Sequence, residues 1–308
     1  MICTLTLNPS IDYAVRVPEL QPEKLNRSTG EYVLPGGKGV NVSRVLGHLG
    51  CETTAMGFEA GFTGGELIRL LQADGCRTDF VHLPDGMTRI NVKVSGQKHE
   101  TEINGRGPEV SPQKLEELFL RLLALPAGTM LVLSGSVPPG VSRSVYAEIM
   151  QRLSGRGIRF VVDAERDLLR EALSHHPFLV KPNQQELSEF FGEEVKNPED
   201  AGRLAVRMRE MGAENVLVSL GGDGAVLASP DHVCRADAPR GIVRNTIGAG
   251  DSMVAGFLAG WERYGGDAAS AMRMGIAAGS ASAFSDDLAA GDEIRALEAL
   301  LPMPEMMR

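Results

Sequence analysis

The segment Asn245–Ser252 combines glycines with a carboxylate, directly before a stretch of helical periodicity. Glycines at the start of a helix leave its first backbone N–H groups exposed, and with the positive end of the helix dipole these groups bind anions. Asp251 would repel a bound phosphate. It can instead act as a base that takes a proton from a hydroxyl while the N–H groups stabilise charge on the phosphoryl group under attack. An acidic residue in a first helical turn can also serve only to stabilise the helix dipole, so the local sequence leaves both interpretations open.

A second glycine-rich segment, Pro35–Ser43, also precedes a stretch of helical periodicity. It offers exposed backbone, the point charge of Lys38 and the side-chain amide of Asn41, which together suit a ligand with hydroxyl and phosphate groups. The same residues could form a plain turn between a strand and a helix. Neither a Walker A motif nor the G-x-G-x-x-G fingerprint of dinucleotide-binding folds occurs in the chain. The phosphate-binding loops of those two classes are therefore not expected.

Three further polar segments each follow an apolar run: Lys181–Leu187, Ser219–Gly224 and Ser134–Gly140. Open α/β sheets bind ligands at the carboxyl ends of their strands, where such segments would lie. Glu186 could hold Mg²⁺ through water, since Mg²⁺ keeps much of its hydration shell in proteins. Ser219–Gly224 could bind a nucleotide phosphate or ribose. Taken one at a time, Lys181–Leu187 is also compatible with an ordinary helix start, and the other two segments with ordinary turns.

The elements that must position these segments are predicted from hydrophobic periodicity. Short, almost continuously apolar runs are typical of strands buried on both faces. They occur at Ile2–Leu7, Met130–Leu133, Phe160–Val162, Phe178–Val180 and Val216–Leu220. Between them, apolar residues recur at helical spacing, as in Val42, Val45, Leu46 and Leu49, in Val254, Phe257, Leu258 and Trp261, and less strictly in Leu115, Leu118, Leu122 and Leu125. Alternating strands and helices predict an α/β fold with a mostly parallel sheet covered by helices.

Two segments depart from this pattern. Residues 12–33 and 88–104 contain alternating polar and apolar residues, and the second forms a predicted β-hairpin around Ser95–Lys98. We therefore expect a small β-sheet attached to the α/β body, with an apolar face that covers a ligand, a partner subunit or both. An arginine of this region could clamp a phosphate with two hydrogen bonds, although a single basic residue is more often just solvated. The basic residues in or beside these segments are Lys24, Arg27, Arg89, Lys93, Lys98 and Arg106.

Composition narrows the class of protein. The chain has 308 residues, 43% of them hydrophobic, and lacks an apolar run long enough to span a bilayer, so a folded protein outside the membrane is expected. A net charge of −9 disfavours binding to nucleic acids or anionic membranes. The first residues lack the basic region of a secretory signal, so we expect a cytoplasmic location. The four scattered cysteines are expected to be free thiols, and His175–His176 lacks a third ligand for a metal.

The polar segments occur in the order and spacing of the ribokinase-like PfkB family of carbohydrate kinases, and the resemblance covers almost the whole chain. Gly36–Asn41 resembles the N-terminal signature of that family, Asn245–Asp251 its C-terminal signature, and Lys181-Pro182-Asn183 with Glu186 its metal-linked motif. Leu5–Asp12 and Ser134–Gly140 are similar to the hexose-phosphate kinase branch. Asn245 departs from the wider family, which often has Asp there. No role is assigned to Phe284–Gly291, which only weakly resembles the family's adenine and monovalent-cation region.

The resemblance implies an α/β/α body formed by residues 1–11, 34–87 and 105–308, with a β lid formed by residues 12–33 and 88–104. It also implies ATP and Mg²⁺ as cofactors. By motif, Asp251 is the expected catalytic base, with an anion hole formed by Gly248, Ala249 and Gly250. The expected sugar-phosphate contacts are Asp12, Arg27, Gly37, Lys38, Asn41 and Arg89, with Arg27 and Arg89 near the substrate phosphate. The expected nucleotide contacts are Lys181, Asn183, Ser219, Gly221 and Gly224, and Glu186 is expected to organise Mg²⁺.

The implied reaction is ATP-dependent phosphorylation of a ketohexose phosphate, in the first place fructose 1-phosphate to fructose 1,6-bisphosphate. Tagatose 6-phosphate is the alternative substrate, because the same loops would serve a sugar phosphorylated at its other end. A non-catalytic sugar-phosphate-binding protein on the same fold is the alternative from a different class, which the intact Asp251 and Glu186 disfavour. The amphipathic lid, together with relatives of this branch, implies a homodimer formed lid to lid. A lid that only covers ligand would have the same pattern.

Overall fold

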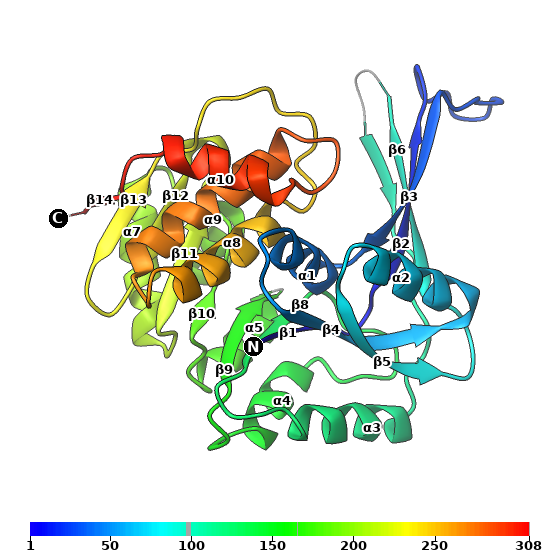
Figure 1. Ribbon diagram of the computed structural model, residues 1–308, viewed down its shortest axis with the longest axis horizontal. Coiled ribbons are helices and arrows are strands. Elements are labelled where there is room, and N and C mark those ends of the chain that lie inside the picture. The colour runs from blue at the N-terminus through cyan, green and yellow to red at the C-terminus, as the bar shows by residue number, and fades with distance from the viewer. Residues whose placement is uncertain (97–99, 165, 308) are drawn as a thin grey trace.

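The computed structural model describes residues 1–96, 100–164 and 166–307, and a ten-stranded sheet runs through this described part of the chain (Figure 1). All neighbouring strands from β11 to β5 are parallel, whereas β12, β13 and β14 add antiparallel pairs at one edge. The strand order is β14 (Glu305–Met306), β13 (Val233–Ala236), β12 (Ala225–Ala228), β11 (Asn215–Ser219), β10 (Leu179–Val180), β9 (Arg159–Asp163), β8 (Met130–Ser134), β1 (Ile2–Thr6), β4 (Thr53–Ala60) and β5 (Arg77–Leu83). The predicted α/β class with a mostly parallel sheet is confirmed.

Helices cover both faces of this sheet, and alternate residues of its central strands point into separate apolar cores. In β8, Leu131 and Leu133 belong to one core, and Met130 and Val132 belong to the other. The first core is closed by α3 (Pro112–Leu123), α4 (Val145–Arg152), α5 (Arg166–Leu173), α6 (Gln184–Phe191) and α7 (Pro198–Glu210). The second is closed by α1 (Lys38–His48), α8 (Ala249–Arg263), α9 (Ala268–Ala283) and α10 (Gly291–Leu300). Burial on both faces explains why these strands are continuously apolar.

A second sheet projects from this body, as Figure 1 shows at the upper right. Its order is β3 (Gly30–Gly36), β2 (Ser10–Arg16), β6 (Arg89–Ser95) and β7 (Glu100–Ile103). The hairpin expected within residues 88–104 is the antiparallel pair β6–β7, although residues 97–99 of its turn, with Lys98, lie outside the described residues. β2 pairs parallel with β6 and antiparallel with β3. The small β-sheet is therefore confirmed, whereas the division of the chain into body and lid remains a prediction.

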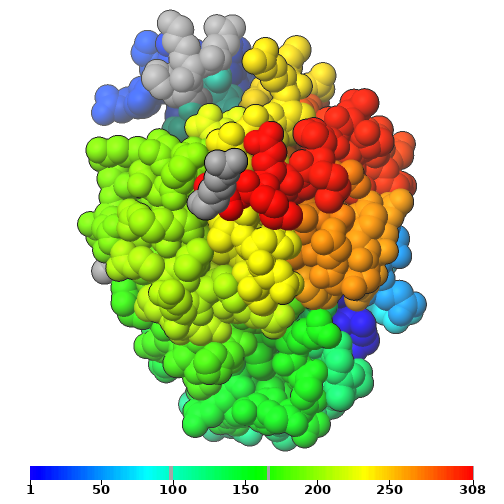
Figure 2. Space-filling model, turned by 90° about the vertical axis from the view of Figure 1, so that its left-hand side faces the viewer, coloured from blue at the N-terminus to red at the C-terminus, as the bar shows by residue number. Residues whose placement is uncertain are grey.

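The two sheets are joined by short segments that become the site. β3 ends at Gly36 and α1 begins at Lys38, so the lid strand leads directly into the first glycine-rich segment. The helix α2 (Gly61–Ala73) and the short 3₁₀ helix η1 (Gly221–Asp223) complete the described elements. Most of the face in Figure 2 belongs to the second half of the chain, coloured green to red.

Two local expectations need adjustment. The amphipathic helix expected after Ser252 begins at Ala249, so Asp251 lies inside its first turn. The helix α3 ends at Leu123, before the last residue of its predicted apolar repeat, Leu125. All four cysteines are free thiols, as expected. In the described residues, none of the helices combines the length and the apolar character needed to cross a bilayer.

Candidate active site

The first turn of α8 carries the second glycine-rich signature. Gly248 is the N-cap residue with φ 77°, and Ala249, Gly250 and Asp251 form the first helical turn. A Cβ on Gly248 would stand 2.7 Å from Leu288 Cδ2, so both the backbone conformation and the lack of space require glycine here. First-turn N–H groups have no acceptor within their own helix. Ala249 N donates to Thr246 O at 3.3 Å, and the turn presents its remaining N–H groups together with the positive end of the α8 dipole, as an anion site needs.

Asp251 is buried, with 7% of its surface exposed, although it carries an ionisable group. The Asn41 Nδ2 atom, on α1, donates a hydrogen bond of 2.8 Å to Asp251 Oδ2. Burial raises the pKa of Asp251 to about 6, and the nearby Asp163 carboxylate adds to the rise. The hydrogen bond from Asn41 and the positive charge of Lys38 offset part of this rise in pKa. Asp251 is thus a carboxylate whose proton affinity is near that needed of a base at neutral pH.

Asp163, at the carboxyl end of β9, is a site residue that the sequence analysis missed. Only 2% of its side chain is exposed, and its Oδ1 lies 3.0 Å from Lys38 Nζ and 3.7 Å from Lys181 Nζ. Burial alone would raise the pKa of Asp163, but the charges of Lys181 and Lys38 hold it below its ordinary value. The available signal was an acidic residue directly after the buried run Phe160–Val162, where α/β sheets place ligand-binding groups.

Lys38 and Lys181 bring two predicted segments to this buried acid. Burial alone would lower the pKa of Lys38, but the carboxylates of Asp163 and then Asp251 raise it above its ordinary value. Lys181 Nζ also stands 3.3 Å from where a Cβ on Gly250 would be, so its ammonium group lies beside the α8 turn. Two fixed cations and the helix N-terminus therefore surround one space next to Asp251, a setting that stabilises a negatively charged group.

A cavity of about 500 Å³ opens on the lid side of the α8 turn. Gly248 and Asp251 lie on its wall. Seven of the predicted site residues meet there from β2, β6 and the N-terminal ends of α1 and α8, and a further set joins them. The predicted ones are Asp12, Gly37, Lys38, Asn41, Arg89, Gly248 and Asp251; the additional ones include Thr6, Asn8, Asn91, Lys93 and Ser136. Its polar wall suits a small hydroxylated ligand.

The lid side of this cavity is organised around Asp12 on β2. Ser10 Oγ donates to Asp12 Oδ1 at 2.6 Å, and Asn91 Nδ2 donates to the same oxygen at 3.0 Å. Lys93 Nζ lies 3.1 Å from the other carboxylate oxygen. Asn91 is a second residue that the sequence analysis missed. The alternation of Ile90, Val92 and Val94 placed Asn91 and Lys93 together on the opposite face of β6, and this was the signal that could have found it.

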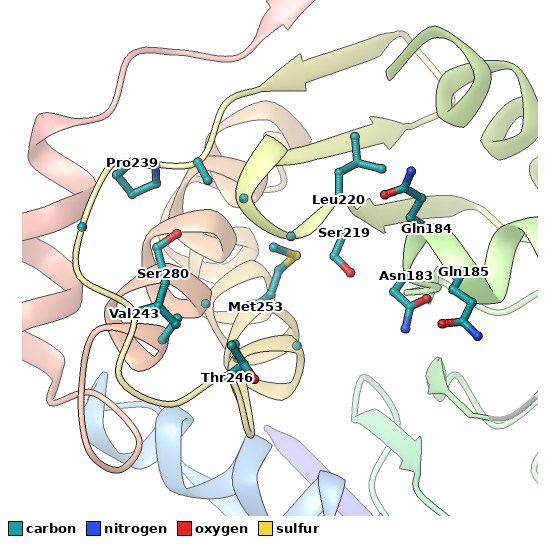
Figure 3. A pocket seen from close by; sticks show the side chains of 18 of the residues that line it. Asn183, Gln184, Gln185, Ser219, Leu220, Pro239, Val243, Thr246, Met253 and Ser280 are labelled. Carbon is teal, nitrogen blue, oxygen red and sulfur yellow. The ribbon is translucent and has the colours of Figure 1, made fainter. Parts of the chain in front are cut away.

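A larger cavity, of about 1080 Å³, opens on the other side of the same turn. Figure 3 shows Asn183 and Ser219 on one side of it and Val243, Thr246 and Ser280 on the other. Of the predicted nucleotide contacts, Asn183, Ser219 and Gly221 line it, and Ala249 and Gly250 of the α8 turn do so as well. Apolar groups complete the wall, among them Leu220, Met253, Ala283 and Phe284. An elongated ligand with an apolar part and a charged end would suit this cavity.

The metal-linked motif forms the start of α6. Asn183 and Glu186 make a capping box, in which the Asn183 side chain accepts from Glu186 N and Glu186 Oε2 accepts from Asn183 N, each at 2.8 Å. The negative charge of Glu186 also contributes to the raised pKa of Lys38. Across the described ranges, no three His, Cys, Asp or Glu side chains gather as a metal cluster. The single carboxylate of Glu186 still fits Mg²⁺, which binds through one or two carboxylates, water and substrate phosphates.

Four predicted residues line neither cavity: Lys181 and Glu186, whose positions are described above, and Arg27 and Gly224. Arg27 lies on the exposed 17–29 segment that connects β2 to β3, and it lines neither cavity. Gly224 ends η1 with φ 91°, and a Cβ there would stand 2.0 Å from Ala236 O, so it serves chain packing behind the cavity wall. The expected ligand contacts of Arg27 and Gly224 stay predictions. The sequence motifs alone predict neither the course of the 17–29 segment nor which residues of the Ser219–Gly224 segment face the larger cavity.

The turn of α8 is thus a shared wall between the two cavities, with Gly248 and Asp251 on one side and Ala249 and Gly250 on the other. A hydroxyl in the smaller cavity would be in reach of Asp251, and a phosphate chain in the larger would be in reach of the N–H groups and Lys181. This arrangement can catalyse transfer of a phosphoryl group between two bound molecules, a reaction that depends on positioning and charge stabilisation.

Comparisons with known proteins agree with this geometry. Residues 5–294 match the family described as pfkB family carbohydrate kinase. The chain is 40% identical over 297 residues to the 1-phosphofructokinase of Bacillus subtilis (96% of this chain, 97% of that one). It is 37% identical over 289 residues to the D-tagatose-1-phosphate kinase of Bacillus licheniformis (94% of each chain). The structure is similar to that of phosphofructokinase-2 from Escherichia coli in complex with substrates and products, with a TM-score of 0.92 and 33% identity over 97% of this chain and 99% of that one.

Proposed function

The chain belongs to the pfkB family of carbohydrate kinases and is a phosphotransferase, and on this basis we propose that it transfers the γ-phosphoryl group of ATP to fructose 1-phosphate, giving fructose 1,6-bisphosphate. The observation that carries this proposal is the α8 turn, which separates the two cavities and places the buried Asp251 beside the smaller one. ATP occupies the larger cavity, and the sugar phosphate occupies the smaller one under the lid. A cytoplasmic location, where ATP is supplied, is part of the proposal.

In this proposal Asp251 is the catalytic base. It takes the proton of the attacking sugar hydroxyl, and Asn41 keeps the carboxylate oriented through its hydrogen bond to Oδ2. The N–H groups of the Gly248–Gly250 turn and the ammonium groups of Lys38 and Lys181 stabilise charge on the phosphoryl group in transit. Asp163 holds both lysines in place. Proton transfer by a positioned base typically contributes about 10²–10⁴-fold to the rate.

The sugar side rests on charges in the smaller cavity. Asp12 accepts hydrogen bonds from ligand hydroxyls as well as from its protein partners, and Gly37 offers backbone close to the sugar. Arg89 is anchored by its Nε to Asn8 O at 3.0 Å and by Nη1 to Gly105 O at 3.3 Å, and it presents the rest of its guanidinium to the substrate phosphate. A planar guanidinium can hold phosphate through two hydrogen bonds.

Mg²⁺ belongs to the proposal as the companion of ATP. Glu186, through water, and the ATP phosphates would hold the ion, whose charge neutralises the phosphates during transfer. The protein's own part at this point is the capping box of α6, which fixes the Glu186 carboxylate relative to Asn183.

The experiment is a coupled assay of ADP release with Mg-ATP. Fructose 1-phosphate, tagatose 1-phosphate, tagatose 6-phosphate, fructose 6-phosphate and free fructose are offered separately. We expect a kcat/KM at least tenfold higher for fructose 1-phosphate than for the other four. Tagatose 1-phosphate is the second candidate, because a relative 37% identical to this chain carries that kinase name. Preference for any other sugar overturns the proposed substrate, and no ADP release with any of the five overturns the proposed reaction.

We also propose that the protein is a homodimer formed through the lid. In the four-stranded sheet, Val33, Tyr13, Val92 and Ile103 stand side by side, one on each strand and on the same face. Val33 is 44% exposed and Ile103 is 62% exposed. The opposite face carries Asp12 and Lys93 and points to the smaller cavity. An apolar row across a whole sheet on the face away from the ligand suits contact with a second copy of the lid.

A further inference from the structure

Arg44 is a buried arginine that the proposed reaction does not use. It lies on α1, three residues after Asn41, so the two side chains leave neighbouring positions of the same helix face. Only 6% of the Arg44 side chain is exposed. Its Nε donates to Asp74 Oδ2 at 2.5 Å, and its Nη1 and Nη2 donate to the two carboxylate oxygens of Asp287 at 3.2 and 2.7 Å. A buried guanidinium is costly unless all its partners are in place, so this geometry is specific.

Asp287 belongs to the 284–290 segment, which lies against the α8 turn. The next residue, Leu288, packs on the N-cap glycine, because its Cδ2 would be 2.7 Å from a Cβ on Gly248. Ala289 N donates to Ser282 Oγ at 3.1 Å, and Ser252 Oγ lies 2.8 Å from both Ser282 Oγ and Gly248 O. The segment therefore lies beside the turn at Leu288 and is linked to it indirectly through Ser282 of α9 and Ser252 of α8, and Arg44 ties the segment to the helix that also carries Asn41.

We propose that Arg44 and Asp287 are a positioning pair for the anion-binding turn of α8. The ion pair holds the 284–290 segment in register with α1, so that Leu288 supports Gly248 in its positive-φ conformation and the N–H groups of the turn aim at the phosphoryl group. The helix α1 then positions two groups of the active site. Asn41 orients the base. Arg44 holds Asp287, and the neighbouring Leu288 supports the α8 turn. Neither Arg44 nor Asp287 is proposed to touch the substrates.

This inference rests on the proposed function. If the α8 turn loses its support, its N–H groups, which are hydrogen-bond donors to the phosphoryl group in transit, are displaced. Removing one hydrogen-bond donor from a transition-state charge costs about 10²–10³-fold in kcat in known enzymes, and small misplacements of such groups also slow reactions strongly. In the proposed reaction the N–H groups of the turn stabilise the phosphoryl group in transit rather than hold the sugar. Loss of its support is therefore expected to lower kcat more than it raises either KM.

The same guanidinium supplies a matched control. Asp74, at the end of α2, also forms an ion pair with Arg44, through one hydrogen bond where Asp287 accepts two, and the two carboxylates are 30% and 39% exposed. Asp74 lies at the end of Arg44 away from the 284–290 segment. Asp287→Asn and Asp74→Asn each remove one negative charge from Arg44 with almost no change of shape, so both should lower Tm to a similar extent. Only Asp287→Asn loosens the segment that supports Gly248.

The experiment compares the purified wild type, Asp287→Asn and Asp74→Asn in steady-state kinetics and in hydrogen–deuterium exchange. For Asp287→Asn we expect a kcat at least about tenfold lower than that of the wild type, both KM values within about twofold, and faster exchange of residues 246–252. For Asp74→Asn we expect kcat within about twofold of wild type and unchanged exchange there. Equal loss of kcat in both variants, or normal kcat and exchange in Asp287→Asn, overturns the positioning role.

The two readouts also separate this inference from the proposed function. If the wild type phosphorylates none of the sugar phosphates, the proposed function fails, and exchange of residues 246–252 still decides whether Asp287 supports the turn. If the wild type is active and the exchange of that turn is the same in both variants, the positioning role alone fails.

Discussion

Asn41 Nδ2 lies 2.8 Å from Asp251 Oδ2, which joins two residues 210 positions apart in the chain. One residue is on the helix that follows the first glycine-rich segment, and the other is in the first turn of the helix that follows the second. The bond fixes one carboxylate oxygen of Asp251. In the proposed reaction, a carboxylate held in this way needs no reorganisation when it meets the substrate hydroxyl, which is the advantage of a preorganised site.

Replacing the base tests its role directly. Asp251→Asn is expected to lower kcat by about 10²–10⁴-fold and to leave substrate binding nearly intact, because the amide keeps the shape of the side chain but cannot accept the proton. Steady-state kinetics with a binding measurement for each substrate checks this. Asp200→Asn is the matched control, since Asp200 occupies the corresponding position in the first turn of α7. Near-wild-type kcat in Asp251→Asn would leave Asp251 only the helix-dipole role.

The acid limb of the pH profile should follow the same group. Burial raises the pKa of Asp251 to about 6, and a base acts only when it is unprotonated. In the free enzyme, kcat/KM should therefore fall as the pH decreases below about 6, by about tenfold per pH unit for a single group. Rates measured from pH 5 to 8 check this. A profile that stays flat down to pH 5 would contradict the assignment of Asp251.

Protein stability offers a test that does not depend on turnover. The pKa of Asp251 rises from its ordinary 3.8 to about 6 in the folded chain, so the folded state binds this proton more tightly than the unfolded chain does. The resulting stability is fully present below pH 3.8 and is lost as the pH rises through about 6. Tm of Asp251→Asn relative to wild type should therefore be higher at pH 8 than at pH 4.5. Parallel Tm curves over that range would show that Asp251 is not held in this state.

Replacing Lys38 should affect the binding of the sugar phosphate more than that of ATP. The Lys38 side chain lines the smaller cavity, and Asp163 holds it there at 3.0 Å. Replacing Lys38 by Met removes a cation next to the sugar phosphate, so KM for the sugar phosphate should rise more than KM for ATP. Kinetics with each substrate varied in turn checks this, and the two constants of one protein serve as each other's control. An equal rise of both would contradict the placement of Lys38 on the sugar side.

The lid dimer predicts a surface-specific effect of charge. Val92→Lys places an ammonium group in the apolar row of the lid and should convert a dimer into a monomer at micromolar concentration, because the charge would be buried between two lids. Leu300→Lys is the control, since Leu300 is 80% exposed on α10, far from the lid row in sequence and on another element. Sedimentation measures the masses. A monomeric wild type removes the dimer proposal, and a dimer that survives Val92→Lys moves the interface elsewhere.

Much of the architecture could be predicted because its signals are local. The run Phe160–Val162 is apolar because both faces of β9 are covered, and the alternation in Ile90, Val92 and Val94 reflects a lid strand with one polar face. The glycines of Asn245–Asp251 predicted that a helix begins at this segment. In each case the residue types follow from burial and backbone conformation within a few positions.

The surroundings of Asp163, Arg27 and Gly224 depend on residues far along the chain. Asp163 is an ordinary acid until Lys38 and Lys181 arrive from other segments. Arg27 carries the right charge, but the 17–29 segment leads it away from the cavities. Gly224 belongs to a glycine-rich segment, yet Ala236 O on the neighbouring strand explains its glycine. Patterns of residue types over a few positions do not predict contacts between residues so far apart in the sequence.

The sequence by itself determined the alternation of strands and helices and the glycines, amides and acids that stand at their ends, because strand burial and helix starts select residue types locally. Only the tertiary structure decided that the α8 turn separates two cavities, that Asp251 is buried beside Asp163, and that Arg44 reaches the segment behind Gly248. The physical reason is that burial, charge and hydrogen bonding act over distances in space, and chain folding alone brings residues 41, 163 and 251 to one place.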